Sequence, residues 1–333
     1  MEPKLINTND FSAHLRSKAI DLENKKILIT NFSGSQQEQD LTEPVNCNGF
    51  GRIRHFKLGS GRNWPANPLP ILPASKALGI AASSEIRSQV FQNSVCNWRC
   101  WYCFVDYSLL NGDKKRSDFF TCDQLLEMYL QQKNPPLMID LTGGQPDLTP
   151  EWVPWMMEAL IDKGMQDKVF LWSDDNLSNE YFWTFLTSKQ IDLISGYKMY
   201  SRVCCFKGID EHSFSLNTKA EPEFFNKQFD LIKRFIDLGI DLYAYITLTA
   251  STATDFESVV PRLLDKMQII NERLPLRTVP LEIFEFSPVK NRMKDEFHDA
   301  MKGQYIANEI WQKELERRFS ATERAAAITE IQY

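Results

Sequence analysis

From about residue 88 onward, the sequence repeats a single pattern: a short run rich in β-forming residues, then a longer amphipathic run. About six such repeats predict parallel strands joined by crossover helices. An incomplete (β/α) barrel and an open doubly wound sheet both fit this pattern, and in either fold ligands bind at the carboxyl ends of the strands. The expected strands cover residues 89–92, 137–141, 168–172, 202–206, 242–249 and 281–286.

Helical patterns separate these strands. A capping box from Thr121 to Gln124 opens one of them, and Gly164 and Gly239 end two others. The expected helices cover 121–133, 151–163, 221–238 and 255–271, and a further helix after Asn291 covers the core. We therefore predict an N-terminal extension over 1–88, a core over 89–290 and a C-terminal helical segment over 291–333.

The first 88 residues follow no such rhythm. A helix is expected at about 8–24 and a strand at 26–30. The basic run from Arg52 to Lys57 is expected to be a solvated loop, as charge runs usually are. Prolines at 65, 68, 70 and 73 predict a segment without regular structure.

Charge and hydropathy exclude several classes of protein. The net charge of −6 gives no electrostatic reason to expect a nucleic-acid partner. No run approaches the roughly 20 apolar residues that cross a bilayer. Seven cysteines, three of them within eight positions, indicate a metal site in a reducing compartment rather than a disulfide framework. We expect a soluble cytoplasmic protein.

The three clustered cysteines, Cys96, Cys100 and Cys103, have the spacing C-x3-C-x2-C. Thiolates suit iron–sulfur clusters and zinc. Three ligands on one loop hold three corners of a [4Fe–4S] cluster and leave the fourth iron open to a cofactor. A zinc site would need a further pair, and Cys204 and Cys205 point to opposite faces of their expected strand. A zinc or iron–sulfur module for structure, sensing or electron transfer is the alternative to an enzyme.

This loop resembles the signature of the radical S-adenosylmethionine (SAM) superfamily, C-x3-C-x-aromatic-C, with Tyr102 at the aromatic position. The resemblance runs from residue 89 to 286 and implies an α/β fold, a partial (β/α)6 TIM-like barrel. It further implies a single [4Fe–4S] cluster that binds SAM and cleaves it reductively to a 5′-deoxyadenosyl radical, which abstracts hydrogen from a substrate. Flavodoxin or ferredoxin would supply the electron, and Tyr102 would lie against the adenine.

Two later segments extend the resemblance. The run Gly143-Gly144-Gln145-Pro146 is similar to the superfamily's G-G-E-P motif, which hydrogen-bonds the methionyl amine of SAM; here glutamine replaces glutamate. Two adjacent glycines also let a ligand approach the backbone closely. After the third strand, Ser173 and Asp175 are the candidates for contacting the ribose, although an aspartate there also serves as a helix cap.

The fourth strand ends in Cys205-Phe206-Lys207, which resembles the D-x-K pattern of the glycyl-radical activating branch, such as pyruvate formate-lyase activating enzyme. The lysine is kept and the aspartate is lost. Lys207 is therefore a candidate partner for the SAM carboxylate. Cys204 and Cys205 are buried strand residues, or one of them donates a hydrogen atom to a substrate radical. The substrate stays open between a small molecule, a peptide and a partner enzyme, and the acidic balance disfavours RNA.

Overall fold

The computed structural model describes residues 5–59 and 64–333. Its main sheet runs in the order β10-β9-β8-β7-β6-β4-β3, and a smaller sheet has the order β1-β2-β5. The strands are β1 (Ile20–Asp21), β2 (Lys26–Thr30), β3 (Arg52–Lys57), β4 (Glu85–Phe91), β5 (Ser117–Thr121), β6 (Met138–Leu141), β7 (Phe170–Asp175), β8 (Tyr200–Lys207), β9 (Leu242–Thr247) and β10 (Thr278–Leu281).

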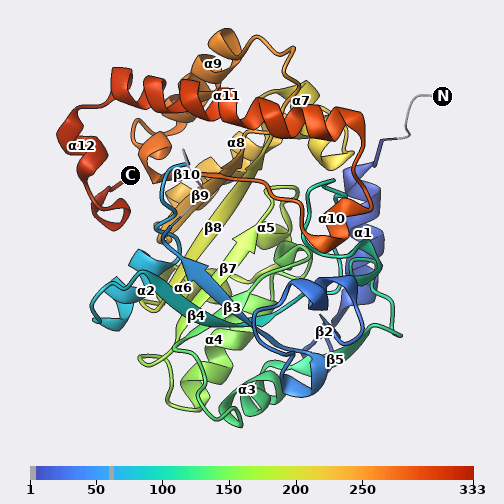
Figure 1. The fold of residues 1–333 in the computed structure, drawn as a ribbon. Helices are drawn as coiled ribbons and strands as arrows, with labels where there is room; N and C mark the ends of the chain where they lie inside the picture. Colours follow the sequence, from blue (N-terminus) through green and yellow to red (C-terminus); the bar gives the residue numbers. More distant parts are fainter. Residues whose placement is uncertain (1–4, 60–63) are drawn as a thin grey trace.

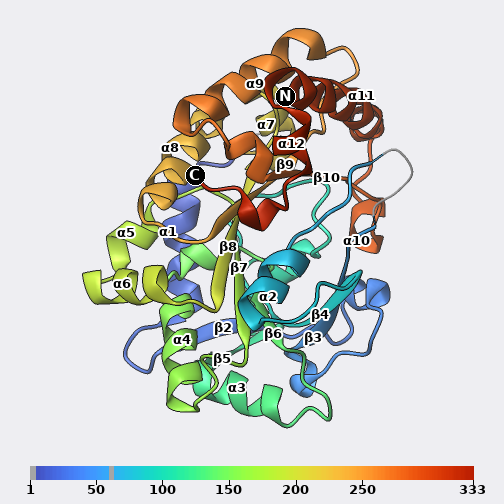
Figure 2. The same cartoon turned by 90° about the vertical axis from the view of Figure 1, so that its left-hand side faces the viewer.

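Strands β4, β6, β7, β8, β9 and β10 are parallel neighbours, and β3 joins the sheet antiparallel to β4. Crossover helices pack along one side of these strands (Figure 2), and the sheet curls as a partial barrel (Figure 1). The expected partial (β/α)6 barrel is confirmed. The helices between the parallel strands are α3 (Cys122–Leu130), α4 (Trp152–Asp162), α5 (Tyr181–Phe185), α6 (Ser188–Gly196), α7 (Glu211–Thr218), α8 (Phe224–Asp237) and α9 (Phe256–Ile270).

The two faces of the main sheet differ in their surroundings. On β8, the ring of Phe206 lies 5.0 Å from that of Phe229 on α8, so this face is covered by helices. Successive strand residues point to opposite faces, so Cys205 and Lys207 point to the other face, which we call the inner face. Cys205 is opposite Tyr245 of β9, which therefore shares the inner face.

The basic run from Arg52 to Lys57 is β3, not the solvated loop that its charge predicted. It pairs with β4 along its whole length, and Arg52 is only 5% exposed. Charge content misled the prediction because arginine is rarely this buried. The extension also contains α1 (Thr8–Ala19), which ends before the expected residue 24.

The proline-rich segment contains a helix that the sequence analysis excluded, α2 (Ile71–Leu78). Pro70 is its N-cap and Pro73 lies in its first turn. Proline is tolerated there because the first backbone N–H groups of a helix have no partner within the helix. The hydroxyl of Tyr245 donates to the carbonyl of Leu69 at 3.2 Å, which ties this segment to the inner face.

The remaining differences concern short elements. The last strand is residues 278–281 rather than 281–286, and β1, β5, α5, α6 and α7 were not expected. Helix α6 opens with a capping box formed by Thr187 and Gln190, a signal present in the sequence but overlooked. The 3-10 helices are η1 (Gln36–Asp40), η2 (Cys47–Gly49), η3 (Tyr107–Leu109), η4 (Pro146–Leu148), η5 (Leu274–Arg277) and η6 (Ile328–Glu330).

A C-terminal helical segment covers the core, as expected. It comprises α10 (Ser287–Lys290), α11 (Asp295–Arg318) and α12 (Ala321–Ala325). The long α11 crosses the upper part of the molecule in Figure 1, next to α9. Within the described ranges, no helix is both long and apolar enough to cross a membrane.

Gly303 allows α11 to approach the end of β9 closely. A Cβ atom at this position would lie 1.9 Å from the carbonyl oxygen of Ala250, which is backbone and cannot turn aside. We expect Gly303→Ala to lower the free energy of unfolding by about 2 kcal/mol or more, measured by chemical denaturation. Gly196→Ala, at the end of α6 with open space around it, is the matched control and is expected to change stability little. Equal stability of Gly303→Ala and wild type would contradict this packing.

Candidate active site

The three cysteines of the motif lie on the loop that follows β4. All three are free thiols and partly exposed. The amide of Cys103 donates to the carbonyl of Cys100 at 3.0 Å, a tight turn that brings these two residues together. The amide of Cys96 donates to Leu110 at 3.1 Å and closes the base of the loop. Among the described residues, no three His, Cys, Asp or Glu side chains are grouped so as to hold a single metal ion.

Side chains between the cysteines anchor this loop to distant elements. The side-chain amide of Asn97 donates to the hydroxyl of Ser12 on α1 at 2.8 Å. The indole of Trp98 donates to the hydroxyl of Thr8 at 3.1 Å. The indole of Trp101 donates to Asn217 of α7 at 3.0 Å. These are buried hydrogen bonds, so the loop is held in one conformation by its neighbours.

The charges around the thiols suit an anionic cluster. Burial raises the pKa of the Cys100 thiol to about 12, while the Lys207 ammonium opposes this shift. Burial likewise raises the pKa of Cys96, opposed by Arg99. A metal ligand must be a thiolate, and nearby cations favour that form. Three soft donors on one anchored loop, with two cations beside them, therefore fit a [4Fe–4S] cluster.

Tyr102 connects the cysteine loop to the carboxyl ends of β8 and β9. Its hydroxyl shares a hydrogen bond with Thr247 of β9 at 3.0 Å. The ammonium of Lys207, the last residue of β8, lies 5.8 Å from the centroid of the Tyr102 ring. Burial alone would lower the pKa of Lys207, but the neighbouring phenol and thiols raise it. The structure thus brings together Tyr102, Lys207 and the thiol of Cys100.

The glycine loop after β6 packs directly on the segment leading to Cys96. A Cβ atom on Gly144 would lie 2.3 Å from the carbonyl oxygen of Asn93 and 2.5 Å from that of Val95. The amide of Gln145 donates to the same Val95 oxygen at 2.7 Å. Both Gly143 and Gly144 have positive φ, which glycine adopts without strain. The close approach at Gly144 is to the protein's own backbone, whereas a Cβ atom on Gly143 would lie 2.5 Å from the side-chain oxygen of Gln92. Pro146 begins the 3-10 helix η4 that follows.

The side chain of Gln145 is almost fully buried, and both ends of its amide are engaged. Its side-chain oxygen accepts from the backbone amide of Asn176 at 3.0 Å, and its side-chain nitrogen donates to the carboxylate of Asp175 at 2.7 Å. A glutamate here would place a second carboxylate against Asp175, which explains the glutamine at this motif position. Contact with a methionyl amine remains a prediction and would require the oxygen to be shared with Asn176.

Behind the glycine loop, a buried guanidinium joins strands β7 and β8 to the 3-10 helix η4. Arg202 on β8 donates to Asp147 of η4 and lies 3.1 Å from the carboxylate of Asp175 at the end of β7. Its guanidinium also lies 4.2 Å from the centroid of the Phe235 ring on α8. Burial raises the pKa of Asp147 to about 7, and Arg202 opposes the shift.

The two ribose candidates lie on the helix-facing side of β7. Ser173 shares a hydrogen bond with the hydroxyl of Tyr200 at 2.7 Å, and Asp175 pairs with Arg202. On the inner face, Asp174 accepts from the indole of Trp172 at 3.1 Å. Asp174 is therefore the inner-face carboxylate at this strand end, and the sequence analysis missed it. The expected strand ends at residue 172. Extending the alternation of its side chains by three residues, to Asp175, would have assigned Asp174 to the inner face.

The two cysteines on β8 also divide between the faces. Cys204 is fully buried on the helix side, whereas Cys205 lies on the inner face at the same level as Tyr245. Burial raises the pKa of Cys205 to about 12, opposed by Lys207, so the thiol stays protonated. If one of the pair donates a hydrogen atom, the geometry favours Cys205.

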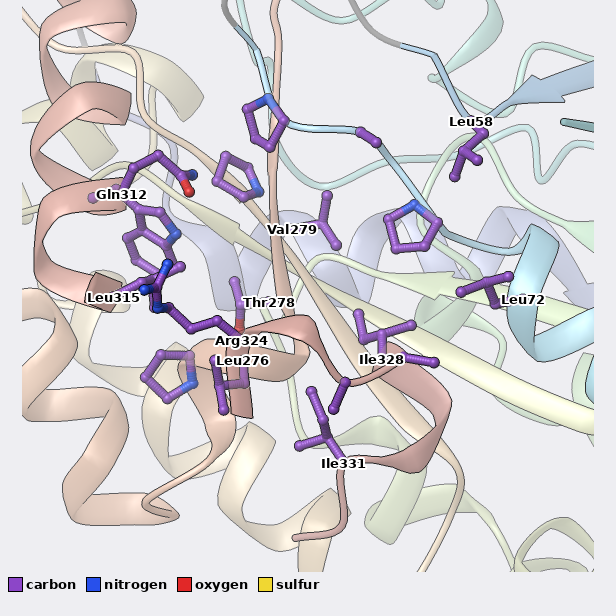
Figure 3. Close-up of a pocket in the computed structure, with 18 residues that line it drawn as sticks. Leu58, Leu72, Leu276, Thr278, Val279, Gln312, Leu315, Arg324, Ile328 and Ile331 are labelled. Atoms are coloured by element: carbon purple, nitrogen blue, oxygen red, sulfur yellow. The ribbon is translucent and has the colours of Figure 1, made fainter. Parts of the chain in front are cut away.

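A separate pocket of about 380 Å³ lies between the proline-rich segment, β10 and the C-terminal segment. Figure 3 shows Leu58 and Leu72 on one side of it and Gln312 and Leu315 on the other. None of the candidate site residues lines this pocket.

Comparisons with known proteins give partial structural matches. No family model matches the sequence, and no curated protein matches it. SuiB of Streptococcus suis bound to S-adenosylmethionine matches with a TM-score of 0.38 at 16% identity, over 54% of this chain and 37% of that one. SuiB bound to precursor peptide SuiA has a TM-score of 0.36 at 14% identity, over 54% and 36%. Native anSMEcpe with bound AdoMet and Cp18Cys peptide has a TM-score of 0.35 at 14% identity, over 57% and 60%. The chain thus spans little more than a third of SuiB.

The pairing of Gln145 with Asp175 can be tested by exchanging its two groups. Gln145→Glu places two buried carboxylates in contact and is expected to cost about 3 kcal/mol of unfolding free energy. The double variant Gln145→Glu/Asp175→Asn restores one amide and one carboxylate and is expected to recover at least half of that loss. Chemical denaturation of the cluster-free protein measures both. Additive losses in the double variant would exclude the interaction.

Proposed function

We propose that this protein is a radical SAM enzyme. A [4Fe–4S] cluster is held by Cys96, Cys100 and Cys103, SAM binds at the carboxyl ends of the strands, and hydrogen is abstracted from a substrate. The supporting observation is the convergence of these thiols with Tyr102 and Lys207 at one end of a parallel sheet. In parallel α/β sheets this end is where ligands bind.

The chain's own residues then have defined tasks. When bound, the cluster would supply the single electron that breaks the sulfonium bond of SAM to yield a 5′-deoxyadenosyl radical. Lys207, held beside the cysteine loop, carries the charge that a SAM carboxylate requires. Tyr102 offers a ring for the adenine, fixed in place by its hydrogen bond to Thr247. On the inner face, Asp174 is a further carboxylate for the ribose hydroxyls.

The C-terminal segment shields this end of the sheet from water. The ring of Phe297 on α11 stacks on Trp101 at 4.8 Å with an angle of 6° between the planes. Ile283 and Val289 belong to the same apolar cluster, which also includes Tyr102. Exclusion of water protects a reactive radical from side reactions, so this cover has a functional role in the proposed enzyme.

The substrate, reductant and compartment belong to the same proposal. The substrate is a small molecule, a peptide or a partner enzyme that receives a glycyl radical, as in the activating-enzyme branch. A flavodoxin or ferredoxin in the cytoplasm supplies the electron. Lys207 is the residue of this chain that favours the activating branch, and Cys205 stands where that pattern has its aspartate.

The first test is anaerobic cleavage of SAM. Wild-type protein reconstituted with iron and sulfide, then reduced with dithionite, is expected to form 5′-deoxyadenosine, detected by chromatography. Cys96→Ala, Cys100→Ala and Cys103→Ala are each expected to reduce it to background, because each removes a cluster ligand. Cys122→Ala, a buried thiol outside the loop, is the control. A protein that binds only zinc and has no affinity for SAM would be a structural or sensing module instead.

Lys207 gives a second test through SAM binding. Lys207→Gln removes the charge beside the cysteine loop and is expected to weaken SAM binding about tenfold or more, because a charge-assisted hydrogen bond is lost. Lys198→Gln changes an exposed lysine before the amino end of the same strand and is the matched control. Equilibrium dialysis with the reconstituted protein measures both. Unchanged affinity in Lys207→Gln would remove this residue from the site.

A further inference from the structure

Two arginines of β3 lie on the inner face of the barrel. Arg52 is opposite Val90 on β4, Val90 is opposite Asp140 on β6, and Asp140 is opposite Trp172 on β7. Neighbours opposite one another across a sheet share a face, so Arg52 faces the same interior as Trp172. Arg54, two residues along the strand, points the same way.

The guanidinium of Arg52 has donors without acceptors. It is buried, yet its Nε and Nη2 atoms have no hydrogen-bond partner among residues 5–59 and 64–333. It lies between the rings of Phe32, at 5.7 Å, and Phe104, at 5.5 Å. Burial and the like charge of Arg54 both lower its pKa. Unpartnered buried donors are costly in free energy and rare in folded proteins.

The nearby carboxylates do not accept hydrogen bonds from these donors of Arg52. Asp140 lies 3.8 Å from Arg54, and neither of its oxygens accepts a hydrogen bond from the part of the chain that the structure describes. Asp174 is already engaged by Trp172 and Thr142. Among the residues that the structure describes, three cationic groups, Arg52, Arg54 and Lys207, therefore face this interior against two carboxylates, Asp140 and Asp174.

The arginine pair is both accessible and close to the cysteine loop. The side chain of Arg54 is 33% exposed, which gives a solute access to the pair. Phe104, the residue after Cys103, lies 5.5 Å from the guanidinium of Arg52 and 6.0 Å from that of Arg54. A group bound to these arginines is thus held beside the loop that carries the three thiols.

We propose that Arg52 and Arg54 bind an oxyanion group of the substrate, a carboxylate or a phosphate. The guanidinium fork matches both groups through paired N–H donors. Such a ligand accepts from the unpartnered donors of Arg52 and offsets the excess positive charge of the interior. This inference deepens the proposed function, on which its assignment to a substrate rests, because it gives the class of molecule that the enzyme accepts.

Thermal stability with small anions tests the site directly. Glutarate and inorganic phosphate at millimolar concentration serve as probes, and the neutral diamide glutaramide is the control ligand. At least one anion is expected to raise the Tm of the reconstituted wild type by about 2 °C, because a ligand of the folded state stabilises it. Which anion acts distinguishes a carboxylate from a phosphate. Equal shifts with glutaramide, or none with either anion, would overturn the proposal.

Variants assign the effect to the arginines. Arg52→Gln and Arg54→Gln are expected to abolish the anion-dependent shift. Lys57→Gln, on the same strand with a side chain 65% exposed, removes the same charge outside the interior and is expected to keep the shift. If all three variants keep it, the anion binds elsewhere and the inference fails.

A second measurement separates a binding role from a structural one. Arg52→Met is expected to raise the Tm of the ligand-free protein, because it removes buried unpartnered donors and a like charge next to Arg54. A lower Tm would assign Arg52 to the folded structure instead.

SAM measurements keep this inference distinct from the proposed function. If wild type fails to cleave SAM, the proposed function fails, while the anion shift still reports on the arginine pair. If Arg54→Gln loses SAM affinity as Lys207→Gln does, the pair serves SAM, and its assignment to the substrate is overturned.

Discussion

The geometry of the candidate site depends on the buried charge of Arg202. It binds Asp147 of η4 and Asp175 at the end of β7, and Asp175 in turn accepts from the side chain of Gln145. Asn176, which donates to Gln145 through its backbone, also donates to the side chain of Asn97 in the cysteine loop at 3.0 Å. Removing one member of such a buried network leaves an uncompensated charge. The end of β7, strand β8, the segment after β6 and the cysteine loop are therefore fixed relative to one another by a single connected set of polar groups.

Segments outside the repeating strand–helix core complete the site. Helix α1 anchors the cysteine loop through Ser12 and Thr8, β3 places Arg52 and Arg54 on the inner face, and α11 covers Trp101. The core supplies the scaffold, the loops and part of the anchoring, while the flanking segments supply further anchoring, the cover and part of the interior charge. The expected division at residues 88 and 290 remains a prediction, and β3 and β4 pair across the first of these boundaries.

The sequence predicted the class of fold because hydrophobic periodicity and parallel crossovers follow from local physics. It placed the cysteine motif correctly at a strand end. It failed where the outcome depended on distant residues. The third strand was expected to end at residue 172, but β7 continues to Asp175. Because side chains alternate along a strand, Asp174 and not Asp175 lies on the inner face. The burial of Arg52 follows from pairing with β4, which charge content alone does not reveal.

The anchoring of the cysteine loop has a consequence for the order of maturation. Its hydrogen bonds reach α1, about 85 residues upstream, and α7, about 116 residues downstream. Contacts of such long sequence separation form late, since chain entropy opposes them until the intervening structure is in place. The loop thus gains its final shape only once much of the chain has folded. In the proposed enzyme, iron and sulfide would then enter a finished scaffold, and assembly of the cluster would not nucleate the fold.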